Sequence, residues 1–179
     1  MQQKIVITGG PGTGKTTLIN ELEKRNFSCT QEISRQVTQQ ARENGIDHLF
    51  LEDPLLFSKL LLEGREQQYK DAIDNTASVI FFDRGIPDVH AYMNHFGTDY
   101  PEIYLEKSKK YRYNLIFLLP PWKEIYTTDD ERYESFELSV SIYKHLKIAY
   151  TELDYKIVEV PFGNINARVD FMLEQLNIL

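Results

Sequence analysis

Short runs of apolar residues alternate along the chain with longer segments whose apolar positions recur every three or four residues. The continuous runs are typical of strands buried on both faces, and the longer spacing is typical of amphipathic helices. Five runs predict strands, at residues 4–8, 27–31, 77–83, 113–119 and 156–160. The remaining segments predict helices, at residues 16–25, about 32–44, 53–73, about 89–96, 101–110, about 133–153 and 164–176. This alternation favours an α/β fold in which a parallel sheet carries helices on both faces.

A glycine-rich loop separates the first predicted strand from the first predicted helix. Residues 9–16 read Gly-Gly-Pro-Gly-Thr-Gly-Lys-Thr and fit the pattern G-x-x-x-x-G-K-[ST]. In this pattern the glycines let backbone N–H groups approach phosphate oxygens, the lysine faces the β- and γ-phosphates, and the final hydroxyl binds Mg²⁺. A chance glycine-rich turn is the alternative, but the strand before the loop and the helix after it are the context that a phosphate-binding loop requires.

We therefore expect the chain to bind ATP and Mg²⁺ at this loop. Lys15 is also a candidate catalytic residue, because its ammonium would neutralise phosphate charge, and Thr16 is a candidate metal ligand. The expected nucleotide-binding residues are Gly9, Gly10, Pro11, Gly12, Thr13, Gly14, Lys15, Thr16 and Thr17.

Asp83 ends the third predicted strand and is the second candidate metal ligand. A carboxylate at the end of a buried strand can hold Mg²⁺ directly or through water in a chain that has a phosphate-binding loop. The alternative is that Asp83 caps a local turn. The carboxyl ends of parallel strands meet at one edge of a sheet, so the loop, Glu32 and Asp83 should border one cleft.

The segment that begins at Asp83 resembles the Asp-Arg-Tyr segment of thymidylate kinases. Residues 83–92 read Asp-Arg-Gly-Ile-Pro-Asp-Val-His-Ala-Tyr, with the Ala-Tyr pair at the spacing of that family. The family's arginine contacts the substrate or the transferring phosphate, and the resemblance carries this role to Arg84. The chain departs from the family at Gly85, where the family has Tyr, and at Asp88, near a usual Ser. Asp83 and Arg84 are catalytic candidates, and Arg84 and Asp88 are substrate-binding candidates.

Over nearly its whole length the chain resembles the NadR-like AAA-type ATPase family, within the P-loop kinase branch of nucleotide-binding proteins. The loop, residues 32–35, residues 82–85 and a Pro-Trp segment followed by residues 128–132 carry the resemblance. It implies a P-loop NTPase three-layer sandwich with a five-stranded parallel sheet in the order 2-3-1-4-5. We expect one such domain over residues 1–179.

The resemblance also implies roles for three charged residues. In P-loop nucleoside kinases a carboxylate after the second strand receives the proton of the substrate hydroxyl, which maps onto Glu32, with Arg35 one helical turn away as a substrate residue. A mobile lid in such kinases carries arginines onto the transferring phosphate, which maps onto Arg132 in a lid over about residues 122–135. The alternatives are that Glu32 is a solvated acid at a helix start and that Arg132 is an exposed arginine paired with a neighbouring acid.

Composition narrows the range of partners. The net charge of -7 disfavours nucleic acid and anionic membranes as partners, and no apolar run is long enough to span a bilayer. The only cysteine, Cys29, excludes an intrachain disulfide, which favours a reducing, cytoplasmic location. The oligomeric state is open.

Together these features predict a kinase that transfers the γ-phosphate of ATP to a small nucleoside- or nucleotide-like acceptor. The alternative is a regulatory ATPase, or nucleotide-dependent switch, that binds a protein or lipid partner. Turnover of an acceptor would distinguish the two.

Overall fold

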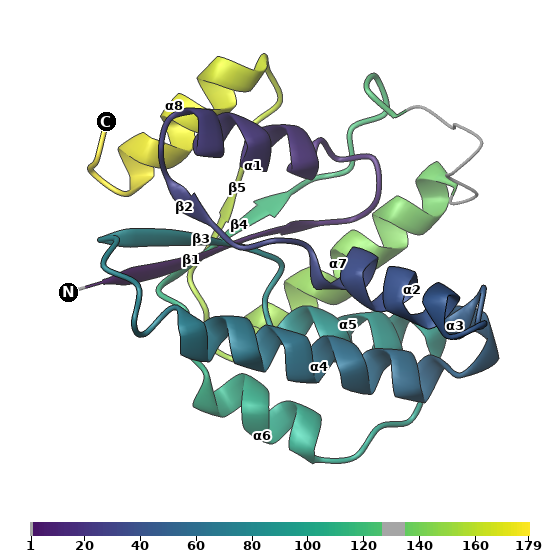
Figure 1. Ribbon diagram of the computed structural model, residues 1–179. Helices are drawn as coiled ribbons and strands as arrows, with labels where there is room; N and C mark the ends of the chain where they lie inside the picture. Colours follow the sequence, from purple (N-terminus) through teal and green to yellow (C-terminus); the bar gives the residue numbers. More distant parts are fainter. Residues whose placement is uncertain (1, 127–134) are drawn as a thin grey trace.

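The computed structural model describes residues 2–126 and 135–179, which form a five-stranded sheet and eight helices (Figure 1). The strands are β1 (Gln3–Gly9), β2 (Ser28–Cys29), β3 (Val79–Asp83), β4 (Leu115–Leu119) and β5 (Ile157–Glu159). The helices are α1 (Lys15–Lys24), α2 (Ile33–Glu43), α3 (Leu49–Glu52), α4 (Pro54–Asp71), α5 (Pro87–Phe96), α6 (Ile103–Lys110), α7 (Phe136–Glu152) and α8 (Ile165–Gln175). None of the described helices is both long and apolar enough to cross a membrane.

The sheet has the order β2-β3-β1-β4-β5 and every pair of neighbouring strands is parallel, which confirms the predicted fold class and strand order. The central strands β3 and β4 are buried along their whole length, as their continuous apolar runs predicted. β2 has only two residues and is shorter than the predicted strand at 27–31. It lies at the edge of the sheet, and the chain turns from it into α2 within a few residues.

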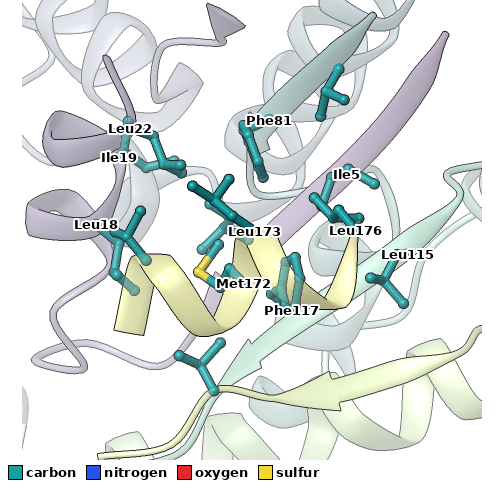
Figure 2. Packing of buried hydrophobic residues seen from close by; sticks show 14 of the residues in the cluster. Ile5, Leu18, Ile19, Leu22, Phe81, Leu115, Phe117, Met172, Leu173 and Leu176 are labelled. Atoms are coloured by element: carbon teal, nitrogen blue, oxygen red, sulfur yellow. The ribbon is translucent and has the colours of Figure 1, made fainter. Parts of the chain in front are cut away.

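Successive side chains of the strands point to opposite faces, and each face is covered by different helices. On one face α1 and α8 pack side by side over the sheet (Figure 1). Figure 2 shows Met172 and Leu173 of α8 beside Phe81 and Phe117 of the strands. On the other face α7 places the fully buried Tyr150 against the sheet, and α4 and α5 lie on the same side. The arrangement is the expected three-layer sandwich.

The helix boundaries agree with the sequence pattern to within a few residues where the structure describes them. The Asp53 side chain accepts a hydrogen bond from the Leu56 N–H at 2.9 Å and caps α4, as its position before Pro54 predicted. The short helix α3 was not predicted, because four residues are too few to show a helical period. α7 begins with Ser135 as its cap, so the predicted start at 133 and most of the predicted lid lie outside the described residues.

One buried carboxylate fixes the turn between β3 and α5. Asp88 is 0% exposed, and it accepts hydrogen bonds from the Thr8 hydroxyl, from the Tyr150 hydroxyl at 2.5 Å and from the Gly85 N–H at 3.0 Å. A Cβ at Gly85 would lie 2.5 Å from the Tyr150 hydroxyl oxygen. The tyrosine that thymidylate kinases carry at this position therefore has no room in this chain.

We expect Tyr150→Phe to lower the free energy of unfolding by about 1–3 kcal/mol, because a fully buried carboxylate loses one of its donors. Tyr143→Phe is the matched control on the same helix, since the Tyr143 hydroxyl donates to the exposed carboxylate of Glu159. That control should change the free energy of unfolding by less than about 0.5 kcal/mol. Urea denaturation measures both. Equal losses would show that the bond between Tyr150 and Asp88 has no special weight in the fold.

Candidate active site

The glycine-rich loop leads from the carboxyl end of β1 into α1. Gly12 and Gly14 have φ angles of 72° and 82°, in the left-handed region that side chains other than glycine rarely adopt. The ring of Tyr126 lies directly against the Cα of Gly12, so a Cβ there would clash. α1 begins at Lys15, and no side chain caps its N-terminus. The N–H groups of the first turn and the positive end of the helix dipole are therefore suited to binding an anion.

The ammonium of Lys15 lies between two carboxylates. Its Nζ donates a hydrogen bond to Asp83 and lies 3.9 Å from Oε1 of Glu32, and the residue is only 6% exposed. Burial, together with the nearby charge of Arg84, lowers the pKa of Lys15, whereas Asp83 and Glu32 act in the opposite direction. The carboxylate oxygens of Asp83 and Glu32 thus neutralise the Lys15 ammonium. In a nucleotide complex we expect phosphate oxygens to take over this role.

Glu32, just before α2, is the carboxylate that connects the cations of the site. Its Oε1 lies 3.6 Å from Nε of Arg84, and its Oε2 lies 3.1 Å from Nε of Arg35. Burial alone would raise the pKa of Glu32, but the charges of Lys15 and Arg84 outweigh it and lower the pKa to about 2. Glu32 is therefore a charged hydrogen-bond acceptor at any ordinary pH and a weak base while these cations face it.

Arg84 connects the turn after β3 to the loop. Its φ of 69° is in the left-handed region, which costs a residue with a side chain roughly 1–2 kcal/mol. Its backbone N–H donates to Ile7 at 3.1 Å, and its Nη1 donates to the carbonyl of Gly9 at 3.0 Å. The guanidinium also lies over the Tyr92 ring, 5.3 Å from the centroid. These contacts hold a cation between Glu32 and the loop.

Asp88 lines the cavity, and its carboxylate is bonded to other groups of the protein. Its carboxylate is fully buried, and it accepts from three neighbours and lies 3.4 Å from Nη1 of Arg84. These contacts position Arg84 beside the loop, and the substrate contact of Asp88 stays a prediction.

The candidate metal ligands lie on two different elements. Thr16 is exposed in the first turn of α1, and Asp83 ends β3 with its carboxylate bonded to Lys15. Among the described residues no group of three or more His, Cys, Asp or Glu side chains could hold a metal ion. The donor set suits Mg²⁺ all the same, because Mg²⁺ in phosphate sites commonly takes one or two protein oxygens and completes its shell with water and phosphate. Asp83 could join such a shell only after Lys15 has moved to the phosphates.

A cavity of about 1300 Å³ extends from the loop across the carboxyl edge of the sheet. Glu32, Arg35 and Arg84 line it close to the loop. One part is bordered by Trp122, which stacks on Phe162 at 5.0 Å between ring centroids, and by Asn164 and Arg168. The other part is lined by aromatic and apolar side chains of α3, α4 and α5, namely Phe50, Phe57, Leu61, Tyr92, Met93 and Phe96. We call this second part the acceptor compartment.

Two buried arginines that line the cavity, Arg65 and Arg168, were not among the candidates from the sequence. Each stands on the apolar face of its helix, and Arg65 lies at helical spacing from the buried Leu61 and Leu62. A charged residue on the apolar face of a predicted helix is the feature of the sequence that could have identified both arginines. Arg132 lies outside the described residues, so its predicted place over the phosphate stays a prediction.

Comparison with known proteins gave a family and a set of related folds. Residues 4–168 match the sequence model of a family described as AAA domain. A structure of NadR protein in complex with NR has a TM-score of 0.76 at 16% identity and covers 98% of this chain, which spans 50% of that chain. Deoxyadenosine kinase from M. mycoides has a TM-score of 0.73 at 16% identity, with 99% and 100% covered. Thymidylate kinase from Candida albicans has a TM-score of 0.72 at 18% identity, with 98% and 91% covered.

At these identities the solved structures establish the fold alone. The comparison with curated proteins found no match.

The charged cluster predicts how stability depends on pH. The pKa of Glu32 is about 2 in the folded protein and near its ordinary value of 4.5 in the unfolded chain. The charged Glu32 side chain therefore contributes fully to the free energy of unfolding above about pH 4.5. The contribution is lost as the pH falls from there towards 2. Glu32→Gln should therefore show a flatter loss of stability over this interval than the wild type, measured by urea denaturation.

The matched control is Glu43→Gln, at the exposed end of the same helix, which should follow the wild-type curve. A Glu32→Gln curve that runs parallel to the wild type between pH 5 and 2 would contradict the assigned charge interactions.

Proposed function

The chain belongs to the AAA domain family and is P-loop kinase-like, and on this basis we propose that it transfers the γ-phosphate of ATP, with Mg²⁺, to a small nucleoside- or nucleotide-like acceptor. The observation that supports this most directly is that one cavity contains both the loop and the acceptor compartment. Glu32 and Arg84 line this cavity next to the loop, where an acceptor hydroxyl would meet the γ-phosphate.

In this proposal the loop and Lys15 bind the phosphates of ATP, and Thr16 and Asp83 hold Mg²⁺. The metal ion would supply positive charge to the phosphate oxygens. Lys15 must leave Asp83 for the phosphates, which frees the Asp83 carboxylate for the metal. Burial of Lys15 favours this exchange, because a buried ammonium needs close negative partners at every stage.

Glu32 would accept the hydrogen bond of the acceptor hydroxyl and take its proton as the new O–P bond forms. With a pKa of about 2 it is a weak base while Lys15 and Arg84 both face it. When Lys15 turns to the phosphates, one of these two cations withdraws, and the pKa of Glu32 rises. ATP binding would thus make Glu32 more basic. A weak base is sufficient at the start of the transfer, because in a loose transition state the new O–P bond forms late.

The remaining charged residues have supporting roles in the proposal. Arg84 would contact the acceptor and the transferring phosphate, and Asp88 would keep it in place through the 3.4 Å contact. The exposed Arg35 would bind the acceptor from the start of α2. Arg132 would close over the γ-phosphate from a lid over about residues 122–135 and stabilise the transition state with its charge.

The acceptor class rests on the cavity and on the related proteins. The deoxyadenosine kinase is described with the product dCMP, and the NadR protein with NR. The aromatic side chains of the acceptor compartment suit a flat base. We also propose that residues 1–179 act as one kinase domain in the cytoplasm. The net charge of -7 supports a small-molecule partner over nucleic acid or membrane.

The test of the proposal is a γ-phosphate transfer assay with a panel of nucleosides, nucleotides and ribosylnicotinamide. At least one acceptor should be phosphorylated and should raise ATP consumption well above the rate without acceptor. ATP hydrolysis that no acceptor changes would favour the regulatory ATPase instead.

Lys15→Met should reduce phosphate transfer by at least about a hundredfold, because the charge facing the β- and γ-phosphates is lost. Lys59→Met, an exposed lysine on α4, is the matched control and should transfer phosphate at the wild-type rate. Both proteins are checked by circular dichroism, since Lys15 is buried. A well-folded Lys15→Met protein with unchanged turnover would refute the assignment of the loop.

Glu32→Gln should reduce acceptor phosphorylation by about a hundredfold or more and change ATP affinity by less than about threefold, because it keeps the shape and removes the base. Glu43→Gln on the same helix again serves as the control. Transfer is measured with labelled ATP, and ATP affinity by calorimetry on the same preparations. Intact transfer in Glu32→Gln would leave Glu32 as a structural acid and make Asp83 the candidate base.

A further inference from the structure

Ser139, in the first turn of α7, connects that helix to the glycine-rich loop. It is 0% exposed, and its Oγ donates a hydrogen bond to the carbonyl of Pro11 at 2.8 Å. The two residues are 128 positions apart in the sequence, so the contact depends on how the helix packs beside the loop. Because Ser139 is fully buried, it cannot touch a bound nucleotide. Any effect of Ser139 on nucleotide binding must therefore act through the loop.

α7 and the loop are in direct backbone contact at Gly10. A Cβ on Gly10 would lie 2.7 Å from Oγ of Ser139 and 2.8 Å from its carbonyl oxygen. Position 10 is one of the open positions of the pattern G-x-x-x-x-G-K-[ST], so phosphate binding does not by itself require glycine there. The contact with α7 explains this glycine, because any side chain would push the helix and its hydroxyl away from Pro11.

The carbonyl of Pro11 and the N–H of Gly12 belong to one peptide group. The group is planar and trans, so its oxygen and its hydrogen point in opposite directions. Ser139 holds the oxygen on the side of α7, and the N–H of Gly12 therefore points away from that helix. No described residue accepts a hydrogen bond from this N–H, and Gly12 borders the cavity. The N–H is thus available to an anion.

The neighbouring carbonyls of the loop have donors of their own, which are Arg84 Nη1 for Gly9, Thr13 Oγ for Gly10 and the Arg168 guanidinium for Thr13. A donor on the carbonyl side of a peptide turns the N–H of the same peptide the other way. Successive N–H groups that face one concave side form an anion-binding nest. Within the described chain, Ser139 is the donor that orients the peptide between Pro11 and Gly12.

A glycine-rich loop needs such a donor, because its backbone is easily deformed. Gly12 has a φ of 72°, and glycine adopts positive and negative φ with similar ease. Without Ser139 the peptide between Pro11 and Gly12 could rotate and turn its carbonyl oxygen towards the phosphates, which it would repel. One hydrogen bond stabilises the productive orientation about fivefold over the rotated one.

We propose that Ser139 is a positioning residue for ATP binding, and that its bond to Pro11 directs the Gly12 N–H towards a phosphate oxygen before the nucleotide arrives. This inference rests on the proposed function in one respect only, which is that the phosphates of ATP bind at the loop. It applies equally to a kinase and to a regulatory ATPase. Pyrophosphate, which has the phosphates without a base or a ribose, is therefore a sufficient probe.

The sequence allows this peptide to be observed directly by NMR. Residues 11 and 12 are the only Pro-Gly pair in the chain. Labelling proline carbonyls with ¹³C and glycine nitrogens with ¹⁵N therefore gives a single carbonyl-to-amide correlation. That signal reports on the carbonyl that Ser139 binds and on the N–H that the proposal assigns to a phosphate.

The signal is recorded for the wild type, Ser139→Ala and Ser141→Ala during titration with pyrophosphate and with ATP. Ser141, on the same helix, bonds to His95 and is the matched control. In the wild type, both ligands should shift the Gly12 amide proton downfield. Ser139→Ala should shift the signal of the free protein and weaken both ligands about fivefold. Its saturated complex should show the wild-type amide shift, because the phosphate then holds the peptide. Ser141→Ala should match the wild type throughout.

Two results would overturn the inference while the loop still binds phosphate. One is an unchanged affinity in Ser139→Ala, and the other is a wild-type Gly12 amide that does not respond to pyrophosphate. A loss of affinity accompanied by shifts of the Gly45 and Gly97 amides, which lie outside the loop, would also overturn it, because Ser139 would then support the fold in general. If the wild type binds neither pyrophosphate nor ATP, the proposed function and this inference both fail. A missing acceptor reaction alone would refute the kinase and leave the role of Ser139 standing.

Discussion

The charged cluster around Lys15 is the interaction on which the rest of the site depends. It joins the loop that follows β1, the segment between β2 and α2, and the end of β3, because the carboxyl ends of parallel strands meet at one edge of the sheet. A buried ammonium must have negative partners, and Asp83 and Glu32 supply them here. In the proposed function, Asp83 would hold the metal ion and Glu32 would take the proton of the acceptor. On this proposal, the two carboxylates that pair with Lys15 would also serve the chemistry once Lys15 binds the phosphates.

A second constraint, in the turn after β3, fixes the position of the cluster. Arg84 adopts a left-handed backbone conformation, and the buried Asp88 holds the turn around it through Thr8, Tyr150 and the backbone of Gly85. Tyr150 comes from α7, on the far side of the sheet from α1. The position of one cation next to the loop therefore depends on packing across the layers. The same packing requires glycine at position 85, where a Cβ would lie 2.5 Å from the Tyr150 hydroxyl oxygen.

The sequence alone was enough to predict the elements that depend on local patterns. The apolar runs gave β1, β3, β4 and β5 within two residues at each end, and the glycine-rich loop was recognised from its spacing. The strand order came from the resemblance, since no local pattern encodes which strands are neighbours. The burial of Asp88 and of Arg65 was not predicted, because both depend on side chains that are distant in sequence. The roles of Glu32, Arg84 and Arg132 stay predictions.

The central claim is that ATP takes Lys15 away from its carboxylates, and a crystal structure with Mg²⁺ and a non-hydrolysable ATP analogue tests it most directly. We expect Nζ of Lys15 to lie about 3 Å from β- and γ-phosphate oxygens and to have left Asp83, whose carboxylate then faces the metal ion directly or through water. A complex in which the nucleotide is bound while Lys15 keeps its hydrogen bond to Asp83 would contradict the account.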